Sequence, residues 1–353
     1  MANSSGCLKT TYGEDLTLIE THTRWVLLAL LFIGLTVFPF FGSSFTIDLA
    51  NQVFLTLIGS LALMLLTGYA GQISLGHAGF LAAGAFTTAI LFKEMQAPIW
   101  ITIPASGLVG AILGIIFGFP SLRLKGLYLA LSTMALHFIV VYLGAEYQTK
   151  RGFATGVVIE PPKLGPITIE NPVAWYFIFF AMDILLILFS MNLIRSKTGR
   201  AWIAIRDRDV AAEALGINVS FFKVSAFVVS SAITSIAGGL FAYYRGFVSV
   251  EAFSLFTTIE YVAIIIVGGL GSILGAVYGT IFIVLLPYII DMIANTFSIP
   301  TRFTTYISAI KYASFGLIMI VFLILEPAGL VGIWNRVKNY FLMWPFKYKP
   351  LGK

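Results

Sequence analysis

Charged residues are scarce in this chain. Only 11% of its 353 residues are Asp, Glu, Lys or Arg, whereas 59% are hydrophobic, and the mean hydropathy is +0.94. A soluble domain carries about a quarter charged residues, so this composition excludes an ordinary soluble fold. Apolar runs long enough to cross a bilayer recur along the whole length. The sequence therefore predicts an all-α, polytopic membrane protein.

Cysteine and the familiar catalytic patterns are also scarce or missing. The single cysteine, Cys7, excludes an intrachain disulfide and makes a cysteine-based metal site implausible. No GxxxxGK[ST] phosphate-binding loop occurs in the sequence. Neither a cluster of metal ligands nor a persuasive Ser/His pair stands out. We therefore expect no catalytic residue, no metal, no cofactor and no enzymatic activity, with any ATP hydrolysis on a separate chain.

The apolar runs can be divided into ten predicted membrane spans of about 20 residues each. They lie at about 25–41, 46–66, 73–92, 99–119, 127–145, 173–194, 223–245, 258–276, 277–296 and 307–325. Ten crossings place both termini on one side. Fifteen of the 22 Lys and Arg residues fall on that side and seven on the other, which predicts that the termini are cytoplasmic. The net charge of +6 is explained by this topology, and we expect no nucleic acid partner.

The segments outside the spans divide the chain further. We expect cytoplasmic tails at residues 1–24 and 331–353, the second rich in basic and aromatic residues, around a membrane domain at 25–330. An outer loop at 146–172 contains several prolines, which favour extended turns. Between residues 258 and 296 no polar loop separates the two spans, so a broken or re-entrant helix is an alternative to a hairpin there.

The stretch TGYAGQISLGHAGF, residues 67–80, interrupts the apolar pattern with glycines and polar side chains. Lipid cannot hydrogen-bond free backbone groups, so such a segment must be buried in protein or line a wet cavity. It is the predicted transport pathway. The candidate residues are Gly71, Gln72, Ser74, Gly76 and His77. The alternative is that the glycines only allow helices to pack closely.

The inner loop, residues 195–222, carries the helical pattern GRAWIAIRDRDVAAEALGIN. One short helix is expected over Arg200–Arg206, and a second is expected to be capped by Asp209 and ended by Gly216. A small-residue face with charges at its edges suits insertion into a groove on another protein. A plain solvated loop of mixed charge is the alternative.

These two stretches together resemble the permease subunits of branched-chain amino acid ABC importers, the LivM type. VSAFVVSSAITSIAGGLFAYYRGFVSVEAFSLFTTIEYVAIIIVGGLGSILGAVYGTIFI, residues 224–283, is also similar to that family, and the resemblance runs from about residue 46 to 330. It implies a multi-pass permease of a bacterial or archaeal cytoplasmic membrane, surrounded by lipid, that works by ATP-driven alternating access. The implied partners are two ATP-binding subunits, a second homologous permease and an extracytoplasmic solute-binding protein.

The resemblance also implies that the inner loop is a short cytoplasmic coupling helix that engages the ATPase. The candidate contact residues are Arg200, Arg206, Asp207, Asp209, Ala211, Ala212, Glu213 and Gly216.

Two alternative functions stay open. Permeases of urea or short-amide ABC importers are similar, and the sequence does not separate them from amino acid permeases. A proton-coupled secondary carrier is an alternative of another class, in which Asp183, an acid within a predicted span, would carry the proton. An intramembrane enzyme is the weakest reading, because Asp183 has no matching acid.

Overall fold

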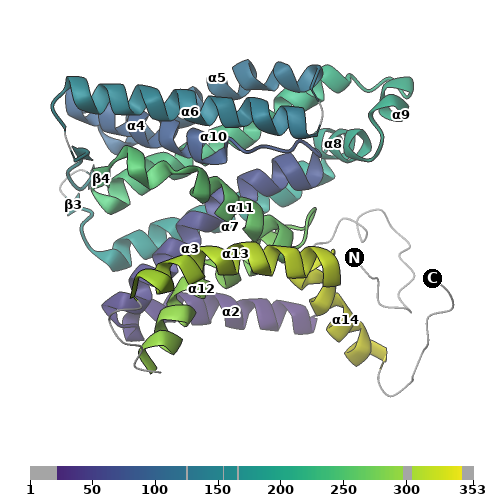
Figure 1. Cartoon of the computed structure of the whole chain (residues 1–353). Helices are drawn as coiled ribbons and strands as arrows, with labels where there is room; N and C mark the ends of the chain where they lie inside the picture. Colours follow the sequence, from purple (N-terminus) through teal and green to yellow (C-terminus); the bar gives the residue numbers. More distant parts are fainter. Residues whose placement is uncertain (1–21, 125, 154, 165–166, 297–303, 344–353) are drawn as a thin grey trace. The chain divides into compact units, whose positions relative to one another are not determined.

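The computed structural model describes residues 22–124, 126–153, 155–164, 167–296 and 304–343 (Figure 1). Residues 1–21 and 344–353, which make up much of the two expected tails, lie outside the described part. The chain divides into two compact units, residues 1–48 and 49–353. The first unit contains α2 (His22–Phe41), and the second contains the glycine-rich segment, the inner loop and the cavity described below.

The described residues are mostly helical. After α2 the elements are α3 (Ser44–Leu63), the π-helical turn η1 (Met64–Tyr69), α4 (His77–Met95), α5 (Ile99–Gly118), η2 (Pro120–Leu122), α6 (Leu127–Lys150), β1 (Val157–Val158), β2 (Lys163–Leu164), β3 (Ile167–Thr168), α7 (Pro172–Arg195), α8 (Lys197–Asp207), α9 (Asp209–Ala214), α10 (Val219–Arg245), β4 (Phe247–Val248), η3 (Val250–Phe253), α11 (Leu255–Gly268), α12 (Ile273–Thr296), α13 (Thr304–Leu325) and α14 (Gly329–Met343).

Among the described residues, seven helices are long and apolar enough to cross a membrane. They cover Ser44–Tyr69, His77–Met95, Ile99–Leu122, Leu127–Lys150, Pro172–Arg195, Val219–Arg245 and Ile273–Ile293. The pair Ile310–Leu325 and Gly329–Phe341, bent by 48°, is an eighth candidate, and Trp25–Phe41 and Leu255–Gly268 are shorter apolar helices. The prediction of an all-α polytopic membrane protein is confirmed, and an apolar helix stands at each of the ten predicted spans.

The expected boundary at residue 276 between two spans is wrong. Helix α11 ends at Gly268 and α12 already begins at Ile273, so residue 276 lies inside a helix. Gly269 and Gly271 have φ angles of +116° and +78°, a region open to glycine at little cost. They close a tight hairpin without a polar loop, which is why hydropathy could not locate the turn.

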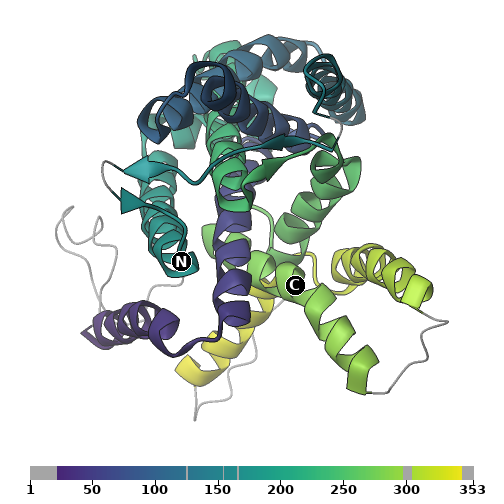
Figure 2. The ribbon, with the colours of Figure 1, turned by 90° about the vertical axis from the view of Figure 1, so that its left-hand side faces the viewer.

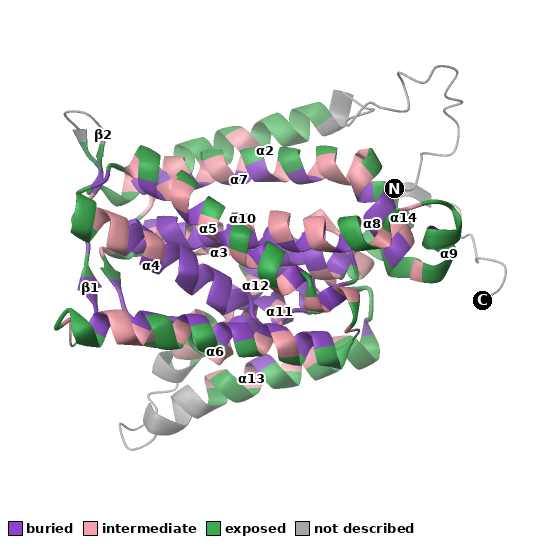
Figure 3. Ribbon diagram, turned by 90° about the horizontal axis from the view of Figure 1, so that it is seen from above, coloured by how far each residue is buried: buried purple, intermediate pink, exposed green. Residues whose placement is uncertain are grey.

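Helix α10 is the centre of the packing in the second unit and lies against α4 and α5. Small residues permit the close approach, because a Cβ on Gly239 would lie 2.7 Å from the Thr88 hydroxyl of α4 and 2.9 Å from the Ser106 hydroxyl of α5. Hydroxyl groups also join the helices, as where Ser235 Oγ donates to the Phe80 carbonyl at 2.8 Å. Figure 3 shows α4 and α10 largely buried, with exposed residues along α5, α6 and α7.

The inner and outer loops lie at opposite ends of these helices. In Figure 1, α8 and α9 lie at one end and β3 and β4 at the other, the end that faces the viewer in Figure 2. Within the outer loop β2 pairs with β3, and β1 of this loop pairs with β4, which follows α10; both pairs are antiparallel. This agrees with the extended turns expected from its prolines.

Candidate functional site

The glycine-rich segment turns back into the protein. Helix α3 continues as the π-turn η1 to Tyr69, residues 70–76 are not helical, and α4 begins at His77. The Nε2 atom of His77 lies 2.9 Å from the Gly59 carbonyl oxygen of α3. Gly59 precedes Tyr69 by roughly 15 Å of helix. The first residue of α4 therefore lies well inside the helical bundle and away from its end.

The polar residues of this segment are buried and use their polar groups within the protein. Gln72 Nε2 donates to the Ala70 carbonyl at 3.3 Å, and Ser74 Oγ accepts from the Gly76 N–H at 3.3 Å. Gly71 is exposed and has a φ of +67°. The polar side chains of the non-helical segment are thus enclosed by protein, whereas Gly71 and Ile73 reach its surface.

Hydroxyl groups from other helices support the start of α4. The N–H of Leu75 donates to Thr133 Oγ1 of α6 at 2.9 Å, and the N–H of Ala78 donates to Thr258 Oγ1 of α11 at 3.0 Å. Ala78 belongs to the first turn of α4, whose N–H groups have no partner within the helix, and Leu75 lies in the non-helical segment just before it. Gly76 is needed here because a Cβ would collide with the Thr133 carbonyl.

The inner loop forms the two predicted helices, α8 and α9. The expected cap is wrong, because Arg208 is the N-cap residue of α9 and Asp209 is already its first residue. Helix α8 is anchored to α10. Trp202 is buried, and its Nε1 donates to the Phe222 carbonyl at 3.0 Å and to Ser225 Oγ at 3.2 Å. Ala201 and Ile205 are buried on the same face. The spacing of these three residues signals an amphipathic helix in the sequence, although they were not among the candidate residues.

Arg206 joins the inner loop to the glycine-rich segment. Its Nη1 donates to the Gly68 carbonyl at 2.7 Å, and its other nitrogens bind Asp207 Oδ1 at 3.1–3.2 Å. A Cβ on Gly71 would lie 2.7 Å from Arg206 Cγ, and one on Gly271 would lie 3.0 Å from Arg206 Nη1. Arg206 and Asp207, expected to contact an ATPase, thus contact each other, and Arg206 also holds the end of η1.

The remaining coupling candidates divide into buried and exposed residues. Ala212 is buried, Asp209 Oδ2 lies 3.6 Å from Lys223 Nζ, and Arg200 Nη1 donates to the Arg195 carbonyl at 2.7 Å. Ala211, Glu213 and Gly216 are exposed. Two large apolar side chains that were not among the candidates, Val210 of α9 and Leu215 directly after it, are 73% and 82% exposed. Helix α9 therefore offers an apolar surface.

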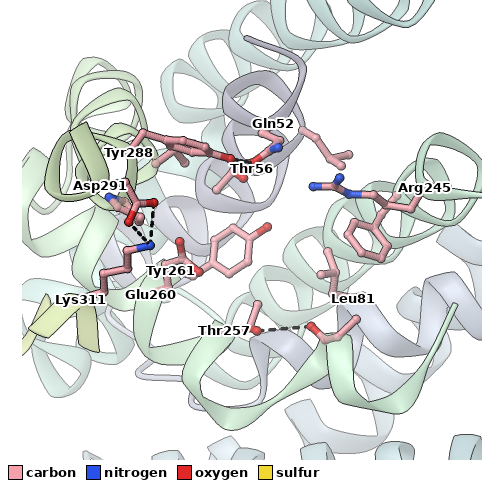
Figure 4. Close-up of a pocket in the computed structure, with 15 residues that line it drawn as sticks. Gln52, Thr56, Leu81, Arg245, Thr257, Glu260, Tyr261, Tyr288, Asp291 and Lys311 are labelled. Carbon is pink, nitrogen blue, oxygen red and sulfur yellow. Dashed lines mark hydrogen bonds and ion pairs between the residues drawn. The ribbon is translucent and has the colours of Figure 1, made fainter. Parts of the chain in front are cut away.

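A cavity of about 440 Å³ lies at the opposite end of the second unit (Figure 4). Its walls come from α3, α4, α10, η3, α11, α12 and α13. Helix α10 begins beside α8 and α9 and ends at Arg245, which lines the cavity. The cavity and the surface of α9 are thus separated by the length of this 27-residue helix, roughly 40 Å.

Four charged residues line the cavity: Arg245, Glu260, Asp291 and Lys311. Lys311 Nζ binds both oxygens of Asp291 at 2.7 Å. Figure 4 shows Arg245 on one side and this ion pair on the other, with Glu260 and Tyr261 between them. Hydropathy placed all four near the ends of spans, so the sequence offered no signal that they share one cavity.

None of the five pathway candidates lines the cavity, but His77 lies directly behind its wall. The rings of His77 and the cavity residue Tyr261 meet edge to face with their centroids 4.8 Å apart. A Cβ on Gly59 would lie 2.8 Å from the Tyr261 ring. Contacts therefore run from Tyr261 through His77 and the glycine-rich segment to Arg206. Asp183 is buried on α7, outside this route, and neither oxygen has a hydrogen-bond partner in the described structure.

The family described as the branched-chain amino acid transport system permease component matches residues 45–323. The chain belongs to this family. The permease protein LivM of the high-affinity branched-chain amino acid transport system is 33% identical over 282 residues in Salmonella typhimurium and 32% identical over 289 in Escherichia coli. These matches cover 73% and 75% of this permease, and 66% and 68% of the relatives, so the chain spans about two thirds of their length.

The relatives of this chain are not uniform in the substrates they are named for. The autoinducer 2 import system permease protein LsrC of an Enterobacter species is 24% identical over 227 residues, which cover 62% of this permease and 60% of the relative. No solved structure matches the permease significantly.

Proposed function

We propose that this chain is the permease subunit of an ATP-driven importer for branched-chain amino acids. It would work with two ATP-binding subunits, a second permease and an extracytoplasmic solute-binding protein, in the cytoplasmic membrane of a bacterium or archaeon. Both termini and the α8–α9 loop would face the cytoplasm, and ATP would be hydrolysed on the separate subunits. The LivM permeases of two bacteria, similar over more than 70% of this chain, support this substrate.

The observation that carries the mechanism is the placement of α9 and the cavity at opposite ends of α10. The cavity opens among helices at the predicted outer side, where a binding protein would deliver the solute. Val210 and Leu215 project at the predicted cytoplasmic side, where exposed apolar side chains suit a groove on an ATP-binding subunit. The contacts of Arg206, His77 and Tyr261 supply a physical route between the two ends.

The test is uptake by the complete importer in proteoliposomes. Radiolabelled leucine should accumulate only with ATP, and urea should not. The double variant Val210→Asp with Leu215→Asp should lose the ATP-binding subunits on purification and lose uptake by about tenfold or more, since two charges would enter an apolar contact. Val158→Asp is the matched control, because Val158 is 61% exposed on β1 at the other end.

The outcomes separate the alternatives. Uptake of urea or an amide in place of leucine would contradict the proposed substrate. Uphill uptake by the chain alone, driven by a proton gradient and abolished by Asp183→Asn, would establish a secondary carrier. Retention of the ATP-binding subunits by the double variant would contradict the docking role of α9.

A further inference from the structure

Two ionisable side chains of the cavity have no oppositely charged partner among the residues that the structure describes. Among the described residues, no acid lies within ion-pair distance of Arg245, whose guanidinium lies 5.6 Å from the ring centroid of Tyr244. Glu260 is half-buried and forms no hydrogen bond or ion pair with a described residue. By contrast, the neighbouring Asp291 and Lys311 satisfy each other. Within the described part of the chain, the cavity therefore presents one guanidinium and one carboxyl group that have no ionic partner.

Unpaired charges among membrane helices are costly, and where they occur they mark substrate or ion pathways. A solute with one group of each sign would supply the missing partners of both residues at once. The planar guanidinium of arginine matches a carboxylate, which it can bind through two parallel N–H···O bonds. A glutamate carboxylate accepts hydrogen bonds from an ammonium group.

The remaining walls suit an apolar substituent. Leu55, Leu81, Phe241 and Val284 line the same cavity. A volume of about 440 Å³ lies within the range of sites for small molecules. A carboxylate, an ammonium group and an aliphatic side chain on one small molecule are the features of an apolar α-amino acid.

We propose that this cavity is a binding site for zwitterionic α-amino acids, in which Arg245 binds the carboxylate and Glu260 binds the ammonium group. This inference rests on the proposed import function and specifies its transit site. Discrimination between amino acids and neutral solutes would thus be built into the permease itself. The apolar wall would accept branched side chains, while neutral amides would leave both charges unpaired.

Cysteine protection tests the site independently of transport. Cys7 is the only cysteine, so Ala252→Cys in a Cys7→Ser background places a single thiol in the cavity wall. The assembled importer in detergent, without the binding protein, is labelled with a small thiol reagent. We expect millimolar L-leucine to slow labelling several-fold. Leucinamide, which lacks the carboxylate, and 4-methylpentanoate, which lacks the ammonium group, should not slow it.

Variants then assign the two roles. Arg245→Ala and Glu260→Gln should each weaken protection by leucine about ten- to a hundred-fold, the usual cost of a lost hydrogen bond to a charged group. Arg245→Lys should retain part of the protection. Arg151→Ala is the control, since Arg151 is an exposed arginine at the same end that binds Glu94 and does not line the cavity.

The proposal is overturned if leucinamide or 4-methylpentanoate protects as well as leucine, or if leucine still protects Arg245→Ala fully. Either result is compatible with ATP-driven leucine uptake by the unmodified importer. It would therefore contradict the proposed binding site and leave the proposed import function unaffected. Absence of leucine uptake in an importer whose cavity leucine does protect would instead contradict the import function alone.

Discussion

At the scale of single residues, the glycines of the segment TGYAGQISLGHAGF do different jobs. Gly71 takes a φ of +67°, a conformation that glycine adopts without strain. Gly76 has an ordinary φ of −99°, but it lies against the backbone of α6. Gly71 is therefore needed for its backbone conformation, and Gly76 is needed for the close packing of α4 against α6. The sequence alone does not distinguish these two roles, because both glycines lie among polar residues.

We predict that Gly76→Ala destabilises the protein by about 1–3 kcal/mol, the usual cost of overpacking. The added methyl would collide with the Thr133 carbonyl, a backbone atom that cannot rotate away. The measurement is the thermal unfolding midpoint of the detergent-purified chain. Gly316→Ala in α13 is the control, because nothing lies within 4 Å of its added Cβ. An unchanged midpoint for Gly76→Ala would show that α4 and α6 can separate at little cost.

The sequence could predict that the segment containing His77 is irregular, since glycines and polar residues interrupt an apolar run. It could not predict the partner of His77, because the Gly59 carbonyl comes from a different helix. The cavity was beyond sequence reasoning for the same reason. Gln52, Arg245 and Lys311 are far apart in the chain and meet only through tertiary packing.

At the scale of elements, the pair α8 and α9 combines a fixed helix with a projecting one. Trp202 and Ile205 of α8 are buried, whereas Val210 of α9 and Leu215, which follows it, are exposed. Both helices were predictable because the loop has helical spacing, an acid near the start of the second helix and Gly216 after its end. The contact of the Arg206 side chain with the end of η1 was not predictable, since a charged side chain on a short helix is expected to face water.

We predict that Arg206→Met lowers ATP-driven uptake by about tenfold while the importer stays assembled. Methionine keeps the apolar stem against Gly71 but loses the hydrogen bond to the Gly68 carbonyl, so movement of α8 no longer pulls on η1. Uptake and ATP hydrolysis are measured together in proteoliposomes. Arg200→Met is the matched control, because among the described residues its guanidinium binds only the nearby Arg195 carbonyl. Equal uptake by both variants would show that Arg206 transmits nothing.

At the scale of the whole molecule, the contacts of the second unit agree with the predicted alternation of spans. That alternation places residues 67–72, the inner loop and the turn at 269–272 on one side of the membrane. The structure brings these segments together around Arg206, through the Gly68 carbonyl at 2.7 Å and the close approach of Gly271. Hydropathy and the distribution of basic residues were sufficient to predict that these segments share one side. Both patterns follow from the membrane and need no knowledge of side-chain packing.

The topology is tested by single cysteines at the two ends of α10. Glu213 on α9 and Glu251 on η3 are both exposed, and α10 separates them by roughly 40 Å. In a Cys7→Ser background, we predict that a membrane-impermeant thiol reagent labels Glu251→Cys in intact cells and labels Glu213→Cys only after permeabilisation. Because α10 is one continuous helix, the two positions must lie on opposite sides if it crosses the membrane. Labelling of Glu213→Cys in intact cells would place the α9 surface outside the cell, where no ATP-binding subunit could reach it.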